Sequence, residues 1–506
     1  MVFVMNETDV VVVGGSLVGL SAAVFLAAKG VRTTLTEPHL GSHPHPRAVG
    51  YTARTQELFD TVGLGDALPD VPRDFRLRRA QVESLAGRWD EATDWTPGQP
   101  KTPTREVERS PHSGAAIAQD RLEPALRARA RELGAALRLG TELVSFHQDA
   151  TGVSGVLRDR AGNESTVRAQ YLIAADGARS FVRETLGIAR SGPGVLQTVR
   201  SVLFRASLDE YLRAGVHQFE IEQPGLRAFL TTYGDDRWVL MFLDDLERDE
   251  AAQRDAIVRA IGRDDVPIEL LVNGRWELSG LVTDRFADGR IFLAGDAAHT
   301  LPPTRGGYGA NTGIADAHNL AWKIAAVLAG TSSPALLETY DAERRPVAWT
   351  RLQQTFARPD YAKYSDAFAG QPILDEAAIE LGQLVRSAGI LGAGDDLPVA
   401  ALPEAWAGQP GTRAPHVRTA SGGSTLEWFG AGWVLLVADA RWGDAAQGLP
   451  IEVRTITDEA IRAAFGLGVG GASLVRPDGY IAWRSQPLDD ARAVLVDAFS
   501  RVAFTR

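Results

Sequence analysis

The chain has 506 residues, of which 45% are apolar and 23% charged, as in soluble globular proteins of roughly two to four domains. Its net charge of −11 argues against a nucleic-acid partner, because duplex binding needs clustered lysine and arginine. The lack of cysteine excludes disulfides, thiol catalysis and cysteine-ligated metals. No apolar run approaches the roughly 18 residues that span a membrane. The first residues lack a signal-peptide pattern, so we expect a cytoplasmic protein.

The first motif follows an apolar run, residues 9–13, that is typical of a buried parallel strand. A helix is predicted over 20–29 and a second strand over 31–36. An acidic residue then follows the last glycine of the turn by 18 positions, close to the spacing that places a carboxylate on an adenosine ribose. The middle glycine is replaced by serine, which is small and whose hydroxyl can donate to a phosphate. We predict a dinucleotide site, with a plain strand-to-helix turn as the alternative. Its residues are Gly14, Gly15, Ser16, Gly19 and Glu37.

A proline-rich loop comes next in the chain. His43 and His45 alternate with prolines there, and no further ligand lies at metal-binding spacing, so we predict a loop and no metal site. Arg47 precedes a predicted helix over 52–59. A cation at that position can reach a cofactor carbonyl or phosphate, and a solvated arginine is the alternative.

The second motif lies after a polar, irregular stretch over 71–109, which we interpret as an excursion into a second domain and a lid over a pocket. A helix is predicted over 116–133, with Gln119 near its start, and antiparallel strands over 143–157. A buried strand over 171–175 then leads into Asp-Gly-Ala-Arg-Ser-Phe-Val-Arg, which begins at Asp176.

The third motif follows a short apolar strand over 291–294. Gly295 lets a ligand approach the backbone, and Asp296 can accept hydrogen bonds from hydroxyl groups. A close-fitting loop leads to a helix that we expect to begin near Asn311 and to pack on one side. The amino end of that helix carries partial positive charge, which suits a ring that becomes anionic on reduction. An ordinary strand, loop and helix is the alternative. The predicted ligand-contacting residues of the loop are Pro303, Gly306, Gly307, Gly309 and Asn311.

Residues 197–283 alternate like antiparallel strands separated by turns. A sheet inserted here would stand over the ligand of the second and third motifs. Its aromatic residues are either core or the lining of an apolar cavity for a planar polycycle. The candidates are Phe219, Phe229, Tyr233 and Phe242.

The three motifs, separated by about 160 and 120 residues, resemble those of the flavin-dependent aromatic hydroxylases of the p-hydroxybenzoate hydroxylase type. The segments PRAVGYTARTQELF, IAQDRLEP and ASLVRPDGYIAWR are most similar to actinomycete aromatic polyketide hydroxylases, such as aklavinone and tetracenomycin-type tailoring enzymes. The chain departs from the family at Ser16 and in the loop over 303–311, which is one residue longer than usual.

The resemblance implies an α/β fold with a discontinuous Rossmann-like FAD-binding domain over 1–75, 105–185 and 283–360. An antiparallel-sheet substrate domain over 76–104 and 186–282 is inserted into it. A helical linker over 361–400 and a thioredoxin-like domain over 401–506 follow. Predicted strands at 433–438, 451–455 and 472–475 agree with the last domain. Without cysteines, that domain is expected to be structural or interactive.

The resemblance also implies the chemistry. In that family, reduced flavin and dioxygen form a peroxide that transfers one oxygen atom to an electron-rich phenol, and the protein binds, orients and excludes water. FAD is expected on the three motifs, with Gln119 as a further cofactor contact and Asp176 bonding ribityl or pyrophosphate oxygens. The flavin is expected to carry the chemistry, and Arg47 is the candidate catalytic residue. NADPH or NADH supplies hydride without a domain of its own. Arg47 and Arg179 are candidates for contacts near the flavin's outward position. We expect a polycyclic aromatic substrate and dioxygen as partners, and a monomer or homodimer.

Two other classes of function stay open. One is a different flavoenzyme on the same scaffold: a quinone-forming oxidase, a Baeyer–Villiger-type oxygenase or an enzyme that inactivates a phenolic antibiotic. The other is a non-catalytic flavin- or ligand-binding carrier.

Overall fold

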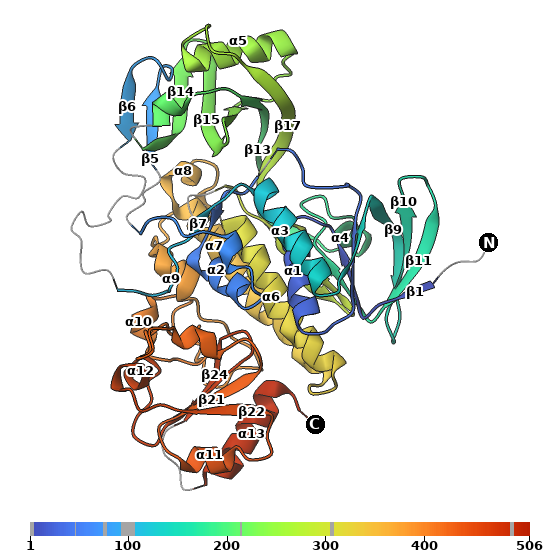
Figure 1. The fold of residues 1–506 in the computed structure, drawn as a ribbon, viewed down its shortest axis with the longest axis vertical. Helices are drawn as coiled ribbons and strands as arrows, with labels where there is room; N and C mark the ends of the chain where they lie inside the picture. Colours follow the sequence, from blue (N-terminus) through green and yellow to red (C-terminus); the bar gives the residue numbers. More distant parts are fainter. Residues whose placement is uncertain are drawn as a thin grey trace.

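The computed structural model describes residues 5–45, 47–73, 78–92, 107–212, 215–303, 308–485 and 490–505. Three parts follow one another along the longest axis of the molecule (Figure 1). A mainly parallel sheet with helices forms the middle. A large antiparallel sheet lies at one end, and the carboxy-terminal α/β part lies at the other.

The middle part is built on a six-stranded sheet with the order β18-β19-β12-β2-β3-β8. In that order the strands are Ala287–Asp288, Ile291–Leu293, Tyr171–Ala174, Val10–Val13, Thr33–Glu37 and Ala136–Leu139. All except β18 pair in parallel. Because β2, β12 and β19 are neighbours, their carboxyl ends meet at one edge of the sheet. Each of the three sequence motifs starts at one of these ends.

Four helices frame this sheet: α1 (Leu17–Ala28), α3 (Gln119–Glu132), α6 (Tyr308–Leu328) and α7 (Thr339–Ala357). Helix α6 begins three residues before the predicted start. It was expected to pack on one side, and this prediction is wrong, since nearly every side chain from Asn311 to Ile324 is buried. Helices α1 and α7 pack against it, and the carboxy-terminal part covers the remainder, where Trp322 meets Trp433 with ring centroids 6.0 Å apart.

Smaller elements complete the middle part. The predicted antiparallel pair over 143–157 is confirmed by β9 and β10, which belong to a sheet with the order β1-β11-β10-β9. These strands are Met5–Glu7, Glu164–Ala169, Val153–Asp159 and Thr141–Gln148. The other elements are β4 (Gly50–Tyr51), α2 (Ala53–Asp60), β7 (Ala115–Ala116) and α4 (Phe181–Thr185).

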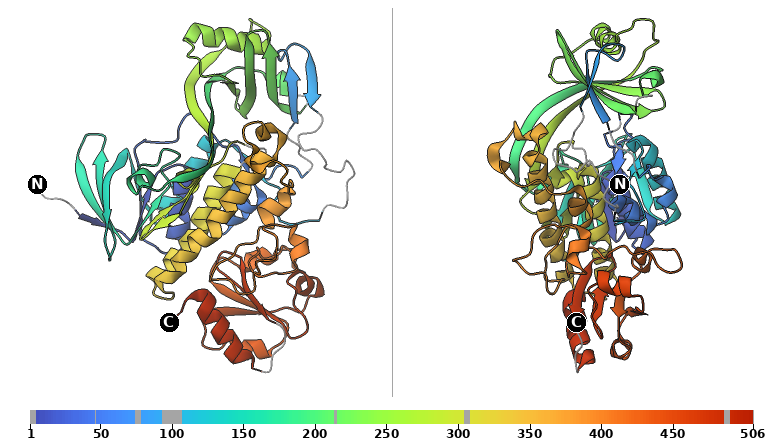
Figure 2. Two further views of the ribbon diagram at one scale, coloured as in Figure 1. Left: turned by 180° about the vertical axis from the view of Figure 1, so that it is seen from behind. Right: turned by 90° about the vertical axis from the view of Figure 1, so that its left-hand side faces the viewer.

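The antiparallel end of the molecule is an eight-stranded sheet with the order β20-β17-β13-β16-β15-β14-β5-β6. In that order the strands are His299–Thr300, Glu269–Thr283, Arg190–Arg205, Arg237–Phe242, Leu226–Gly234, Val216–Gln223, Arg78–Val82 and Trp89–Ala92. The long strands β13 and β17 rise out of the middle part (Figure 2). Helix α5 (Glu250–Ile261) covers the outer face and is capped at its amino end by Asp249, whose side chain accepts from the Ala252 N–H.

The carboxy-terminal part holds a four-stranded sheet with the order β22-β21-β23-β24, in agreement with the expected thioredoxin-like arrangement. The strands are Ile451–Thr455, Trp433–Val437, Ala472–Val475 and Ile481–Ser485. The helices are α10 (Pro403–Trp406), α11 (Arg441–Ala445), α12 (Glu459–Ala464) and α13 (Ala491–Ala503).

The linker over 361–400 was expected to be helical, and most of it is not. Helix α8 spans Pro359–Ala362 and α9 spans Glu376–Leu381, with a single 3-10 turn at Asp366–Phe368 between them. Glycines and prolines recur through residues 370–398 and interrupt helical hydrogen bonding, so that only short turns form.

Buried ion pairs dock the carboxy-terminal part onto the middle part. Arg476, which precedes the turn at residues 477–479, contacts both carboxylate oxygens of Glu343 on α7, at 2.7 and 2.9 Å. Lys323 on α6 binds the same carboxylate at 3.0 Å. Asp478 accepts from the Trp322 indole at 3.1 Å, and Arg413 pairs with Glu57 on α2. One polar network therefore ties α2, α6 and α7 to the carboxy-terminal part.

Candidate functional site

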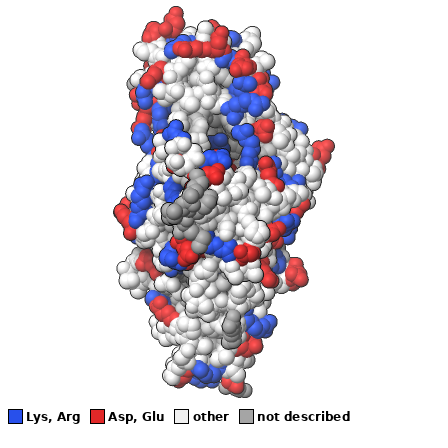
Figure 3. Space-filling model, turned by 90° about the vertical axis from the view of Figure 1, so that its right-hand side faces the viewer, with Lys and Arg blue, Asp and Glu red and all other residues white. Residues whose placement is uncertain are grey.

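A cavity of about 1800 Å³ lies between the eight-stranded sheet and the motif-bearing edge of the parallel sheet. Figure 3 shows a hollow at this junction, with lysine and arginine side chains at its edge. Residues of all three motif regions line the cavity, among them Ser16, Gly177 and Asp296. The topology therefore brings three distant stretches of sequence to one site.

The first glycine turn is packed too tightly for side chains. Gly14 has φ +103°, and a Cβ there would lie 2.3 Å from the Ala175 carbonyl oxygen. A Cβ on Gly19 would lie 1.9 Å from the Gly14 oxygen. The Gly15 N–H donates to Glu37 Oε2 at 2.6 Å, so the predicted carboxylate sits directly beside the turn. This is the local geometry that a close backbone approach to a pyrophosphate requires.

Ser16 behaves differently from the prediction. Its hydroxyl was expected to donate to a phosphate, but it donates to Glu123 Oε1 at 2.8 Å. Gln119 donates to Ser16 Oγ at 2.7 Å, and its Oε1 accepts from the Ala48 N–H at 3.3 Å. Glu123 is buried, and sequence analysis did not identify it. This bonding fixes the serine within the wall and links the turn to the segment that carries Arg47.

Asp176 follows β12 and has one oxygen engaged within its own motif, where Oδ2 accepts from the Val182 N–H at 3.1 Å. Oδ1 is buried and accepts no hydrogen bond from any described residue. Burial raises the pKa of this carboxyl, and neighbouring donors act in the opposite direction. Oδ1 is therefore an acceptor that fits a ligand hydroxyl.

Gly295 and Asp296 form the corner after β19. Gly295 has φ +61°, and its Cα side is closed by Val18 of α1. Asp296 lines the cavity. Burial raises the pKa of Asp296, while His299 and Arg47 lower it. Arg47 thus lies near the corner, as the prediction of a cofactor contact requires.

Asp316 on α6 binds the backbone of this corner, and sequence analysis did not identify it. Its carboxylate accepts from the Gly295 N–H at 3.3 Å and the Arg344 Nε at 2.7 Å, and His299 Nε2 lies 2.7 Å away. Burial opposes ionisation, but Arg344 and His299 outweigh it and hold the pKa of Asp316 below its usual range. A charged residue in a largely apolar helix was the signal in the sequence from which Asp316 could have been identified.

The amino end of α6 faces the cavity through Tyr308 and Gly309, and Pro303 lines it as well. Gly306 and Gly307 lie outside the described residues. The Asn311 side chain was predicted to contact the ligand, but its amide group is hydrogen-bonded within the protein. Its Oδ1 accepts from the Thr52 N–H at 3.1 Å, and its Nδ2 donates to the Gly50 carbonyl at 3.2 Å. Asn311 therefore positions the helix start.

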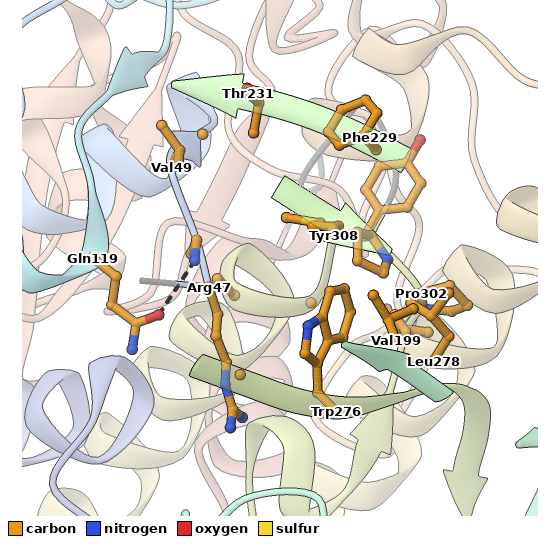
Figure 4. A pocket seen from close by; sticks show the side chains of 18 of the residues that line it. Arg47, Val49, Gln119, Val199, Phe229, Thr231, Trp276, Leu278, Pro302 and Tyr308 are labelled. Carbon is orange, nitrogen blue, oxygen red and sulfur yellow. Dashed lines mark hydrogen bonds between the residues drawn. The ribbon is translucent and has the colours of Figure 1, made fainter. Parts of the chain in front are cut away.

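The eight-stranded sheet supplies the opposite wall. Phe229 and Tyr233 line the cavity as predicted. The prediction for Phe219 and Phe242 is wrong, because both point to the other face, into the core beneath α5. Sequence analysis missed four apolar wall residues, several of which Figure 4 shows around the cavity with Arg47 and Gln119. They are Val199, Met241, Trp276 and Leu278.

The described residues contain no cluster of three or more histidine, aspartate or glutamate side chains able to hold a metal ion. Their helices also include none long and apolar enough to cross a membrane.

The arrangement of hydrogen-bonding groups around the cavity fits an extended dinucleotide such as FAD. The glycine turn and Glu37 match an adenosine and pyrophosphate end. Asp296 lines the cavity, and Asp176 lies directly before the lining residue Gly177 with a buried Oδ1 that has no donor among the described residues, so both carboxylates suit ligand hydroxyl groups. The amino ends of α1 and α6 both point at the cavity, where their partial positive charge favours anionic groups.

Comparison with known proteins agrees with this geometry. Residues 7–355 match the family model described as the FAD binding domain. Residues 407–503 match the model described as the aromatic-ring hydroxylase carboxy-terminal domain.

Relatives match over nearly the whole chain. Tetracenomycin B2 monooxygenase-dioxygenase of Streptomyces olivaceus is 39% identical, with 98% of each chain covered. The 4-methyl-5-nitrocatechol 5-monooxygenase of a Burkholderia species is 38% identical, covering 98% of this chain and 97% of its own. A solved ternary complex of aklavinone-11 hydroxylase with FAD and aklavinone is 34% identical with a TM-score of 0.86, covering 98% of this chain and 99% of the other.

Proposed function

Because the chain belongs to the FAD-binding aromatic-ring hydroxylases, we propose that it is an NAD(P)H-consuming monooxygenase that hydroxylates a polycyclic aromatic polyketide. One observation carries the proposal. A single cavity has the three flavin motifs on one side and the apolar and aromatic wall of the eight-stranded sheet on the other. A planar ring held on that wall faces the place where the motifs hold a cofactor.

The chain's own residues hold and orient the cofactor. Glu37 and the glycine turn would hold the adenosine and pyrophosphate end. Asp296, which lines the cavity, and Asp176, next to the lining residue Gly177, would accept hydrogen bonds from hydroxyls of the cofactor's linking chain. Asp316 fixes the Gly295 corner, so Asp296 is presented at a defined place. FAD, when bound, supplies the redox chemistry that activates dioxygen.

The sheet wall orients the aromatic substrate and keeps the reaction dry. Trp276, Phe229 and Leu278 provide flat apolar surface against which a fused ring packs. The apolar side chains of this wall would also exclude water from the place where cofactor and substrate meet. The nicotinamide cofactor has no domain of its own, and Arg47 and Arg179, which both line the cavity, are the cations proposed to meet its phosphates.

Labelled dioxygen tests this function. FAD-loaded protein is incubated with NADPH or NADH, ¹⁸O₂ and a panel of anthracycline- and tetracenomycin-type phenols, and product mass is measured. We expect one ¹⁸O atom in the product and NAD(P)H oxidation that rises on addition of the phenol. A product without ¹⁸O, formed with stoichiometric hydrogen peroxide, would show an oxidase and overturn the proposal.

A second candidate is hydroxylation of a smaller substituted phenol, which the 38% identity to the nitrocatechol monooxygenase favours. The same labelled assay with 4-methyl-5-nitrocatechol separates the two candidates. Higher kcat/KM for the nitrocatechol than for every polycycle in the panel would establish the smaller substrate.

A further inference from the structure

The sheet wall of the cavity changes in polarity along the strand order. Strands β17, β13 and β16 contribute Trp276, Val199 and Met241. Phe229 follows on β15, and the far side of the wall carries Glu220 on β14 and Arg79 on β5. A substrate that fills this wall therefore has one apolar end and one end that meets polar side chains.

The arginines at the polar end are matched by acids. Arg79 Nη1 donates to Glu220 Oε1 in a close ion pair, and the Arg79 guanidinium stacks over the Phe229 ring at 5.2 Å from its centroid. Further along the wall, Arg227 lies 4.0 Å from Glu222. These contacts commit the positive charge of this end to the protein's own carboxylates.

Arg275, on β17, is also matched, because it binds Asp245 at 2.9 Å. Glu277 and Asp209 line the cavity as well, and neither is ion-paired among the described residues. At the β14–β5 end the wall carries Glu220 and Glu222 beside Arg79 and Arg227, so acids and arginines are equal in number there. A ligand carboxylate placed at this end meets Glu220, and the nearest cation, Arg79, is already paired with it.

Gln218 lies on β14 next to the Arg79–Glu220 ion pair, and Arg79 on β5 is its partner in the strand register. It lines the cavity, and its Oε1 is buried and accepts no hydrogen bond from any described residue. An acceptor in this state suits a neutral donor such as a phenol or alcohol hydroxyl, and a carboxylate cannot supply one.

We infer that the β14–β5 end of the wall selects an uncharged, hydroxylated end of the polycycle and rejects a carboxylate, with Glu220 as the specificity residue because it neutralises Arg79. The inference rests on the proposed function and deepens it by naming the substrate class. Glu220 is 49% exposed and Arg79 20% exposed, so a substitution at Glu220 leaves the core of the sheet untouched.

Three anthraquinones that differ at one substituent test the inference: chrysophanol carries a methyl, aloe-emodin a hydroxymethyl and rhein a carboxylate. Their dissociation constants are measured with the FAD-loaded protein by absorbance titration. We expect both neutral compounds to bind about tenfold or more tightly than rhein, which is about the effect of one unfavourable charge contact at a partly exposed site. Rhein binding as tightly as chrysophanol would overturn the inference.

Variants at positions 220 and 79 test whether Glu220 is the specificity residue. Glu220→Gln releases Arg79, so we expect rhein to gain about five- to tenfold while chrysophanol changes less than about twofold. The double variant Arg79→Met, Glu220→Gln is expected to lose that gain. Glu250→Gln on α5, 71% exposed and outside the cavity, is the matched control and should change no ratio. If the ratio of the rhein to the chrysophanol dissociation constant (the rhein ratio) is the same in Glu220→Gln as in the parent, the assignment to Glu220 is overturned.

The outcomes separate this inference from the proposed function. If neutral anthraquinones bind and are hydroxylated while the rhein ratio stays near one, only the specificity inference fails. If the parent binds none of the three compounds and its NAD(P)H oxidation responds to none, the polycyclic substrate class fails and the inference falls with it.

Discussion

Glu380, on α9, carries a carboxyl that folding drives toward its neutral form. Burial raises its pKa from about 4.5 to about 8, although Arg351 acts in the opposite direction. Because the folded state holds the proton more tightly, the unfolding free energy falls as pH rises from about 4.5 to about 8 and then levels off.

Replacement by glutamine should remove this pH dependence. At pH 5, Glu380→Gln and the parent are expected to be nearly equally stable, whereas at pH 9 the variant should be more stable by about 1–3 kcal/mol. Urea unfolding at the two pH values measures the difference, with the exposed Glu250→Gln as control. An equal stability difference at both pH values would contradict the prediction.

At the scale of elements, α6 approaches the Gly295 corner so closely that a single methyl group decides its packing. A Cβ on Gly313 would lie 2.5 Å from Val18 Cγ2 and 2.8 Å from the Gly295 Cα. Alanine inside a helix normally gains about 0.5–1 kcal/mol over glycine. Here the overlap with α1 and the corner costs about 1–3 kcal/mol, so the packing term wins.

We therefore expect Gly313→Ala to destabilise the protein and to weaken FAD retention. Gly309 in the same helix is the control, because a Cβ there would have the Leu301 oxygen as its nearest neighbour, at 3.9 Å. Gly309→Ala should therefore be neutral or slightly stabilising. Thermal unfolding of both variants without added FAD checks the contrast. Flavin content is compared between Gly313→Ala and the parent only, because Gly309 itself lines the cavity. Equal effects of the two substitutions would show that helix propensity, and no close approach, governs α6.

The same elements show what the sequence predicts and what it leaves open. The strands that lead to Gly14, Asp176 and Gly295 are predicted by short apolar runs next to glycines, which are local signals. The face of a strand is different, because alternation with a period of two within each strand does not fix the register of the β14–β15 hairpin. That register, which pairs Phe219 with Leu230 and Phe229 with Glu220, places the two phenylalanines on opposite faces. Which of the two faces meets the cavity depends on α5, which packs on the Phe219 side.

Burial of α6 on all sides depends on the whole molecule. Trp322 and Asn319 meet Asp478 more than 150 residues away in sequence, so no local pattern announces the contact. The same holds for Asp316, whose partner Arg344 comes from α7. Sequence analysis identified the ligand-facing motifs, whereas their supports come from side chains brought together only by tertiary packing.

Across the whole molecule, α7 connects the carboxy-terminal part to the candidate FAD site through two adjacent residues. Glu343 binds Arg476 of the carboxy-terminal part, and Arg344 binds Asp316, which holds the Gly295 N–H. The carboxy-terminal part contains no cysteine and so offers no thiol chemistry. Its buried arginine instead fixes the helix from which the Gly295 corner is supported.

Arg476→Met tests this connection, because methionine keeps the apolar stem and removes the charge. Glu343 is fully buried, and loss of its bidentate partner is expected to cost about 3–5 kcal/mol of unfolding free energy. Lys323 remains as a partner, so the lower end of that range is more consistent with the geometry. Urea unfolding gives the stability change, and fluorescence of released flavin gives the change in FAD affinity.

A matched pair of variants separates docking from a general loss of stability. Adding Glu343→Gln to Arg476→Met leaves Lys323 and Asp478 as the buried charges of the cluster, so the cluster is again neutral overall. The double variant should therefore recover about 1–3 kcal/mol relative to the sum of the single changes. Arg501→Met on α13, whose side chain is 60% exposed and lies 3.6 Å from Asp497, removes an arginine from the same part without touching α7. If Arg501→Met weakened FAD binding as much as Arg476→Met, support of the Gly295 corner through α7 would be contradicted, because Arg476 contacts that helix through Glu343 and Arg501 pairs within α13.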